Sequence, residues 1–193
     1  VEDDFDNDFR PPHLYVPAIQ CLEDEGRTFY AGTFTKTLFP GLRLGYLVVP
    51  ESFVAHVEES MFIAGHVGSV PVQSVLFDFL DQGHYAKHVN RTRRLYAERK
   101  RLLEELSELE LSDRMTPVAC EIGLQITVLL KDGRDDVALS RQAAALNLGL
   151  QPLSLNYHFG AVRHGLLLGY ATLNEQEMRL NVGILRSLLA RGA

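Results

Sequence analysis

The amino-acid sequence predicts an α/β fold, in which short buried strands alternate with helices. Apolar stretches at 28–31 and 44–49 have the length of interior strands. A helical spacing of apolar residues runs from 84 to about 109, with charged residues on the other face. Hydrophobic residues make up 46% and charged residues 23% of the 193 residues, close to the averages of globular domains.

The first part of the chain is expected to hold two strands and two helices. Prolines between 11 and 17 mark an irregular connection ahead of the first strand. After the second strand a helix is expected at 51–64, followed by a break. Pro71 suits the first turn of another helix, which ends near Gly83.

The second part begins with the long helix at 84–109. The elements expected after it are a strand at 122–130, a helix at 135–147 and a strand at 166–170. Asn174 and Glu177 have the spacing of a capping box, which predicts the start of a final helix.

The segment 32–46 carries the clearest chemical signal, because it sets Lys36 among hydroxyls and glycines, with Arg43 seven residues later. A phosphate-bearing aldehyde cofactor needs an amine to form a Schiff base and donors to hold its phosphate. Lys36, Thr33 and Arg43 supply those groups. A lysine in such a connection is usually solvated. The apolar residues around this one argue instead for burial, which would lower the lysine pKa as amine chemistry requires.

An acidic segment, 1–10, opens the chain. Such a run of charge is normally a solvated surface. A pyridine ring, however, withdraws electrons only while its nitrogen is protonated, and this requires a carboxylate beside it. The segment is therefore a candidate for the second half of the same cofactor site.

These two motifs resemble those of a known family. The lysine segment looks like the lysine motif of fold-type I, pyridoxal-phosphate-dependent aminotransferases, and in particular of the aminotransferase-like domain of MocR-type regulators in the GntR superfamily. The acidic segment is similar to the acidic strand-end motif of the same regulators. The resemblance implies the later half of a fold-type I large domain over 1–83. A long linking helix and an α+β small C-terminal domain would then cover 84–193.

The resemblance also assigns roles to individual residues. Lys36 is expected to be the Schiff-base lysine and Asp3 the partner of the pyridine nitrogen, with Arg43 and Thr33 as phosphate ligands. Phe5 stands where the family has a tyrosine whose hydroxyl donates to the cofactor's ring oxygen, so that hydrogen bond would be missing. No metal site is expected, because the seven histidines lack partners at metal-ligand spacing.

A second departure from the enzymes lies near the C-terminus. An ungapped alignment on Gly169-Tyr170-Ala171 puts Leu167 where aminotransferases carry an arginine that binds the substrate carboxylate. Arg163 would replace it only in a shifted register.

Three functions therefore stay open. The first is a transcriptional regulator that senses a small amine or amino-acid effector through pyridoxal phosphate. The second is a free-standing aminotransferase acting on an amino acid. The third is a degenerate binding or dimerisation module without cofactor.

Length and charge limit the partners expected of these residues. An intact fold-type I unit is roughly twice as long as 193 residues, so the resemblance implies a fragment that lacks any upstream DNA-binding domain. Cofactor binding by this fragment alone is expected to be weak or absent. A net charge of −6 argues against DNA binding by these residues themselves. The family implies a homodimer.

The expected compartment is the cytoplasm. No apolar run approaches the roughly 20 residues that span a bilayer, and no signal peptide opens the chain. Cys21 and Cys120 lack metal-ligand spacing and are expected to be buried as small apolar residues.

Overall fold

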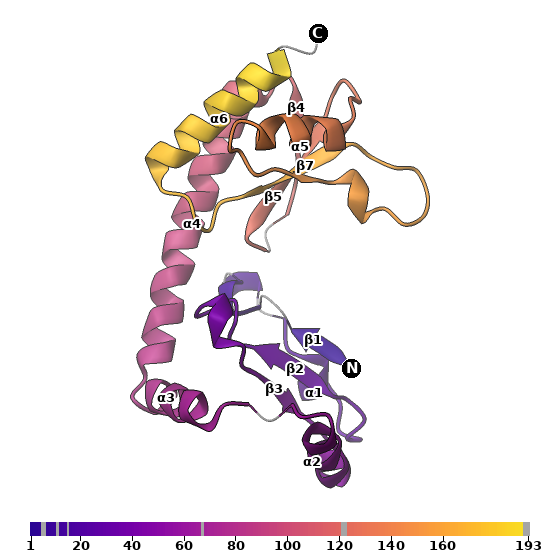
Figure 1. Ribbon diagram of the computed structural model, residues 1–193, viewed down its shortest axis with the longest axis vertical. Coiled ribbons are helices and arrows are strands. Elements are labelled where there is room, and N and C mark those ends of the chain that lie inside the picture. The colour runs from indigo at the N-terminus through magenta and orange to yellow at the C-terminus, as the bar shows by residue number, and fades with distance from the viewer. Residues whose placement is uncertain (5–6, 11, 15, 67, 121–122, 191–193) are drawn as a thin grey trace. The chain divides into compact units, whose positions relative to one another are not determined.

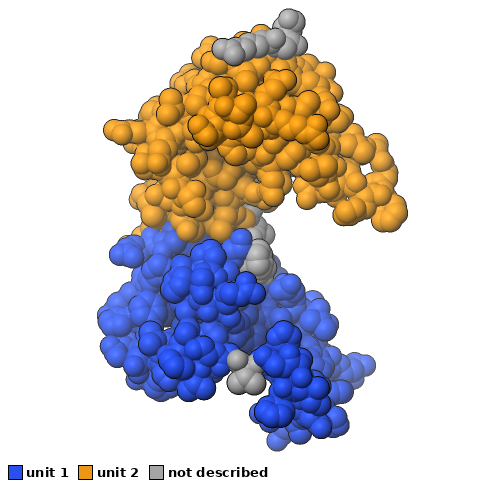
Figure 2. Space-filling model, in the orientation of Figure 1, with its two compact units in different colours: residues 1–93 blue, residues 94–193 orange. Residues whose placement is uncertain are grey.

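A computed structural model describes residues 1–4, 7–10, 12–14, 16–66, 68–120 and 123–190 of the chain (Figure 1). Contacts divide the chain into two compact units, 1–93 and 94–193, shown in blue and orange in Figure 2. The domain boundary at residue 83 that the sequence predicts, where the large domain would give way to the linking helix, stays a prediction.

Unit 1 contains a mixed three-stranded sheet in the order β1-β2-β3. Its strands are β1 (Glu2–Asp4), β2 (Tyr30–Thr33) and β3 (Gly45–Val48). Strand β1 runs parallel to β2, whereas β3 runs antiparallel to it. The carboxyl ends of β1 and β2 and the amino end of β3 therefore lie at one edge of the sheet.

The helices of unit 1 are mostly short. They are η1 (Asn7–Phe9), η2 (Pro12–Leu14), α1 (Ile19–Leu22), η3 (Pro40–Leu42), η4 (Glu51–Phe53), α2 (Val54–Ile63) and α3 (Val70–Asp81). The helix expected at 51–64 forms as η4 followed by α2, and α3 places Pro71 in its first turn as predicted.

Helix α4 (His84–Leu111) supplies residues to both units. Val89, in its first part, is buried in unit 1. Leu103, Leu106 and Leu111, farther along the helix, belong to the core of unit 2. The long helix predicted from the sequence is therefore confirmed, with an end two residues later than expected.

Unit 2 has a four-stranded sheet in the order β4-β5-β7-β6, and every neighbouring pair is antiparallel. The strands are β4 (Met115–Val118), β5 (Gln125–Leu130), β6 (Gln151–Pro152) and β7 (Gly165–Gly169). Residues two apart, such as Ile126 and Val128 or Leu166 and Leu168, are buried because alternate side chains face the same side. They join α4, α5 (Asp136–Ala144) and α6 (Glu175–Ala190) in one apolar core, and η5 (Ser154–Asn156) links β6 to the following loop.

The predicted capping box at the start of α6 is confirmed. The Asn174 Oδ1 accepts a hydrogen bond from the Glu177 backbone N–H at 3.0 Å. The Glu177 carboxylate in turn accepts one from the Asn174 backbone N–H at 2.8 Å. Two of the N–H groups that a helix start leaves unpaired are thereby satisfied.

The exposure of the two cysteines differs from the prediction. Cys21 and Cys120 are both exposed, so their predicted burial is wrong. Among the described residues, no helix combines the length and the apolar character needed to cross a membrane.

Candidate functional site

Four of the five residues predicted to contact a cofactor lie around one edge of the unit 1 sheet. Asp3 is in β1, Thr33 is the last residue of β2, and Lys36 follows in the turn after that strand. Arg43 directly follows η3, two residues before β3 begins. The fifth, Phe5, lies outside the described residues.

The strand register separates two neighbouring carboxylates. Asp3 pairs with Ala31 in the ladder, so it shares a face with Ala31 and Thr33. Asp4 lies on the opposite face, where its carboxylate accepts a hydrogen bond from the Tyr30 hydroxyl at 2.5 Å. Burial, together with this bond, raises the Tyr30 pKa above its ordinary value. On the face that holds Asp3, its ladder partner is the small Ala31, and Leu47 of β3 lies next to Ala31.

Lys36 sits in a tight turn, and the residue after it, Thr37, is held by hydrogen bonds. The Leu38 N–H donates to the Phe34 carbonyl at 2.9 Å, and the Thr37 hydroxyl donates to the same oxygen at 3.3 Å. Thr37 is only 3% exposed. Lys36 itself is exposed, so the burial that its apolar neighbours suggested is wrong for this chain. The turn is fixed while the lysine side chain faces outward.

Helix α4 provides that anchor. The Tyr85 hydroxyl contacts Thr37 Oγ1 at 3.2 Å, and His88 Nε2 lies 2.7 Å from the Thr37 carbonyl oxygen. Farther along the helix, the Arg93 guanidinium donates to the Asp8 carbonyl oxygen at 2.7 Å. Asp8 belongs to η1, which follows β1. These contacts were not predicted, because no local pattern links residues so far apart in sequence.

The hydroxyl of Thr33 already has partners within the turn. It accepts a hydrogen bond from the Thr35 N–H at 3.1 Å and donates to the Leu44 carbonyl at 3.5 Å. The second distance is at the outer limit of a hydrogen bond. Because a hydroxyl has one hydrogen and two lone pairs, this hydrogen can turn to another acceptor while the bond from Thr35 persists.

Arg43 has an unusual backbone conformation, with φ 48° and ψ 37°. This left-handed region is strained for residues other than glycine. Its side chain is exposed and lines a pocket of about 660 Å³ with residues from β3, α2, α3 and the loop between those helices. Asp3, Thr33 and Lys36 do not line that pocket, so the pocket and the sheet edge share Arg43 alone among the predicted residues.

Leu167, at the place of the family's substrate arginine, lies in the middle of β7. Its ladder partners are Thr127 in β5 and Gln151 in β6, and both are uncharged. Arg163 is exposed two residues before β7 begins. The register therefore places no charged residue directly beside Leu167.

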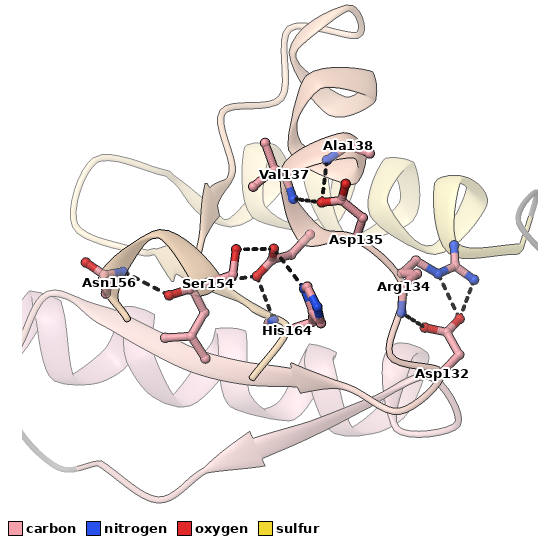
Figure 3. Close-up of polar contacts among 11 residues, drawn as sticks. Asp132, Arg134, Asp135, Val137, Ala138, Ser154, Asn156 and His164 are labelled. Carbon is pink, nitrogen blue, oxygen red and sulfur yellow. Dashed lines mark hydrogen bonds and ion pairs between the residues drawn. The ribbon is translucent and has the colours of Figure 1, made fainter. Parts of the chain in front are cut away.

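A second polar cluster, in unit 2, was missed by the sequence analysis. The fully buried Asp136 accepts hydrogen bonds from Ser154 Oγ at 2.5 Å, from the Ser154 N–H at 2.9 Å and from the Gly165 N–H at 2.9 Å, and His164 Nδ1 lies 3.2 Å from it (Figure 3). Burial alone would raise the pKa of Asp136, but these hydrogen bonds outweigh it and lower the pKa to about 2. The one local signal was an aspartate at the first position of a helix.

This cluster has the residue types of a Ser-His-Asp triad but not its geometry. In a triad the histidine accepts the proton of the serine hydroxyl. Here the Ser154 hydroxyl and His164 both contact the Asp136 carboxylate. The cluster therefore joins α5, η5 and β7 and does not form a nucleophile. Among the described residues, no group of three or more His, Cys, Asp or Glu side chains is arranged to hold a metal ion.

Comparison with known proteins agrees with the resemblance that the two motifs show. The chain is 37% identical, over 187 residues and 97% of its length, to the probable rhizopine catabolism regulatory protein MocR of Rhizobium meliloti. The chain matches the aminotransferase-like part of MocR-type regulators. It is also 31% identical, over 98% of its length, to the HTH-type transcriptional regulator YhdI of Bacillus subtilis. The match covers 38% of MocR and 40% of YhdI, so this MocR-type chain spans less than half of either relative. No family model matches it.

The fold agrees with the family. The MocR-type chain superposes on the kynurenine aminotransferase of Pyrococcus horikoshii, whose structure contains PMP, with a TM-score of 0.82 and 25% sequence identity. The superposition covers 98% of this chain and 47% of the enzyme. The predicted α/β fold of the later part of a fold-type I aminotransferase is therefore confirmed.

Proposed function

We propose that this chain is part of a pyridoxal-phosphate-binding, effector-sensing domain of a MocR-type transcriptional regulator. The observation that carries the proposal is that Asp3, Thr33, Lys36 and Arg43 lie at one sheet edge in a chain of that family. Their amine, carboxylate, hydroxyl and guanidinium are the groups that an aldehyde cofactor with a ring nitrogen and a phosphate requires.

The residues present fit this cofactor. Asp3 shares its face with the small Ala31, and Thr33 retains a hydrogen that can turn toward a new acceptor. Arg43 is exposed, and its guanidinium suits a phosphate through two parallel N–H groups. Pyridoxal phosphate, when bound, would supply an aldehyde that exchanges one primary amine for another.

Each residue then has one role. Lys36 would supply the resident amine, and Asp3 would keep a proton at the pyridine nitrogen because a neighbouring carboxylate favours the charged form. Thr33 and Arg43 would hold the phosphate. An incoming amine that displaces Lys36 would release that side chain and so favour a second conformation of the domain. The effector would therefore be a small amine or amino acid.

The remaining partners belong to the whole protein. We propose that DNA is bound by a region outside these residues, as expected of an HTH-type regulator, because this chain has a net charge of −6. A homodimer in the cytoplasm is the assembly that the family resemblance favours.

The first test is chemical trapping in the intact regulator. Borohydride reduction after cofactor loading, followed by peptide mapping, should place a pyridoxyl group on Lys36. Lys36→Ala should abolish it. Lys87→Ala, which removes an exposed lysine of α4, should leave it unchanged. A parent protein without any adduct on Lys36 would contradict the proposal.

A second measurement separates a regulator from an aminotransferase, which the structural likeness to such enzymes keeps as the alternative. The regulator should bind a DNA fragment from upstream of its own gene, with an affinity that changes when amines or amino acids are added. The cofactor-loaded protein should release no keto acid from an amino-acid panel, because Leu167 offers no charge to a substrate carboxylate. Steady keto-acid production without any effect on DNA would instead favour the enzyme.

A further inference from the structure

We propose that Tyr85 and His88 of α4 are positioning residues for Lys36. Both contact Thr37, the next residue, and so hold the turn that carries Lys36. This inference rests on the proposed role of Lys36 as the resident amine. It assigns a function to two side chains that do not belong to the cofactor motifs.

Thr37 is the fixed point of the turn. Among the described residues, the buried polar side chains are Thr37, Ser107 and Asp136, and Thr37 is the member that lies in unit 1. A buried polar residue is costly unless its polar groups are hydrogen-bonded. The Thr37 hydroxyl is hydrogen-bonded to the Phe34 carbonyl and to the Tyr85 hydroxyl. The backbone carbonyl of Thr37 is hydrogen-bonded to His88.

The contact from His88 has a defined direction. A carbonyl oxygen carries no hydrogen, so His88 Nε2 must donate at this distance of 2.7 Å. The neutral ring must therefore carry its proton on Nε2, and the charged ring carries one there as well. The bond to the Thr37 carbonyl consequently exists in both charge states of the histidine.

Tyr85 is likewise held in its donor form. Burial is the main cause that raises the Tyr85 pKa to about 12, so its hydroxyl keeps its hydrogen at physiological pH. Its ring also packs edge-on against Phe34, with centroids 5.6 Å apart. Tyr85 thus touches both the first residue of the turn and Thr37.

These contacts fix the direction in which Lys36 leaves the backbone. The Thr37 side chain and carbonyl are each bonded to α4, and the Leu38 N–H closes the turn on Phe34. A reacting amine gains from such support, because small displacements of a reacting group lower rates strongly.

The same helix also contacts the segment that follows the strand bearing Asp3. The Arg93 guanidinium donates through two nitrogens to the Asp8 carbonyl, at 2.7 and 3.2 Å. Because Asp8 lies in η1 just after β1, α4 contacts the segments that follow both strands of the candidate site.

Hydrogen–deuterium exchange of the cofactor-free intact protein tests the inference, followed over a peptide that covers 34–44. Tyr85→Phe keeps the ring and removes the hydroxyl, and His88→Ala removes the donor to Thr37. We expect each to speed exchange in this peptide by about tenfold. His88→Gln should restore the parent rate, because an amide N–H can also donate to the carbonyl. Lys87→Ala, on the same helix, is the matched control.

The outcomes separate this inference from the proposed function. Parent-like exchange in both His88→Ala and Tyr85→Phe, at an unchanged melting temperature, would overturn the positioning role. So would a His88→Gln protein that exchanges as fast as His88→Ala. A parent protein that forms no pyridoxyl adduct on Lys36 would refute the proposed function, and the exchange rates would still show whether α4 holds the turn.

Discussion

At the scale of single residues, Arg43 is informative because its backbone is strained. A left-handed conformation costs an ordinary residue about 1 kcal/mol, and such strain tends to be retained where a side chain is needed. The position is one that glycine would occupy without cost. The presence of arginine there supports a role for its guanidinium in phosphate binding.

Substitution of Arg43 should separate that role from stability. Arg43→Gly is expected to raise the free energy of unfolding by up to about 1 kcal/mol in urea titrations, because glycine relieves the strain. Cofactor affinity of the intact protein should fall in the same variant. Asn147, with φ 59° in unit 2, provides a control. Asn147→Gly should stabilise the fold without lowering the affinity for the cofactor. An unchanged cofactor affinity in Arg43→Gly would show that Arg43 does not contribute to cofactor binding.

Asp136 allows a prediction about pH. Its pKa is about 2 in the folded chain, below the ordinary value of 3.8. A depressed pKa stabilises the fold fully above the unfolded pKa, and this stability is lost as the pH falls from about 4 to about 2. The free energy of unfolding that Asp136 contributes in this way is about 2 kcal/mol. Urea titrations between pH 2 and pH 6 should show this loss in the parent chain.

Asp136→Asn provides the comparison. The amide places donors among the N–H and O–H groups that now converge on the carboxylate, so we expect a destabilisation of about 2 to 3 kcal/mol at neutral pH. The stability of this variant should also depend less on pH in the acid range. A variant with the parent's pH dependence would show that other carboxylates cause the acid effect.

At the scale of elements, the sequence predicted those whose signals are local. The long helix, the helix that begins near Pro71 and the final helix all follow from apolar spacing and from terminal residues. The strands on either side of the lysine turn were also predicted, with ends displaced by one or two residues. Such signals lie within a few residues of the element they specify.

Two strands were missed for a common physical reason. Strand β4 contains Pro117 and β6 contains Pro152, and both lie at the edges of their sheet. Proline cannot donate to a ladder, so it is tolerated at an edge but weakens the pattern of a strand. These two segments are strands because they pair with β5 and β7, which the local sequence does not reveal.

The candidate site was likewise predictable only in part. The motif residues Asp3, Thr33, Lys36 and Arg43 could be proposed because the sequence places them in two short segments, and their roles stay a prediction. Their support by α4 could not be proposed in this way, because Thr37 meets Tyr85 and His88 across 48 and 51 residues of sequence. Contacts of that range depend on the fold and leave no periodic pattern.

The cap of α6 is a test at this scale. Asn174→Ala removes the acceptor for the Glu177 N–H, and we expect a loss of about 1 kcal/mol in the free energy of unfolding. Asn174→Asp keeps an acceptor near the positive end of the helix and should be close to the parent. A loss of stability in the aspartate variant as large as in the alanine variant would argue against the cap as the cause.

At the scale of the whole molecule, the two units differ in how much apolar surface they bury. The cluster of buried hydrophobic residues lies in unit 2, whereas only Leu76 and Val89 are buried hydrophobic residues among those described in unit 1. Large side chains of unit 1 are correspondingly exposed, such as Phe62 and Ile63, each at 76%. Burial of apolar surface is the main stabilising term, so unit 1 should be the weaker of the two.

This difference predicts the behaviour of the 193-residue chain by itself. Amide protons of unit 2 should exchange slowly and those of unit 1 quickly, and unfolding should occur in two steps. For the same reason we expect pyridoxal phosphate to bind this chain weakly or not at all. Stoichiometric cofactor on the isolated chain, measured by its absorbance after gel filtration, would contradict that expectation.

The anchoring of the lysine turn by α4 also bears on the order of assembly during synthesis. A protein is made from its N-terminus, so Lys36 leaves the ribosome before Tyr85 and His88 do. The Arg93 contact to Asp8 spans 85 residues and forms later still. A nascent chain that stops short of α4 therefore carries Lys36 without the contacts that Tyr85 and His88 make with Thr37, and these can form only after translation has passed that helix.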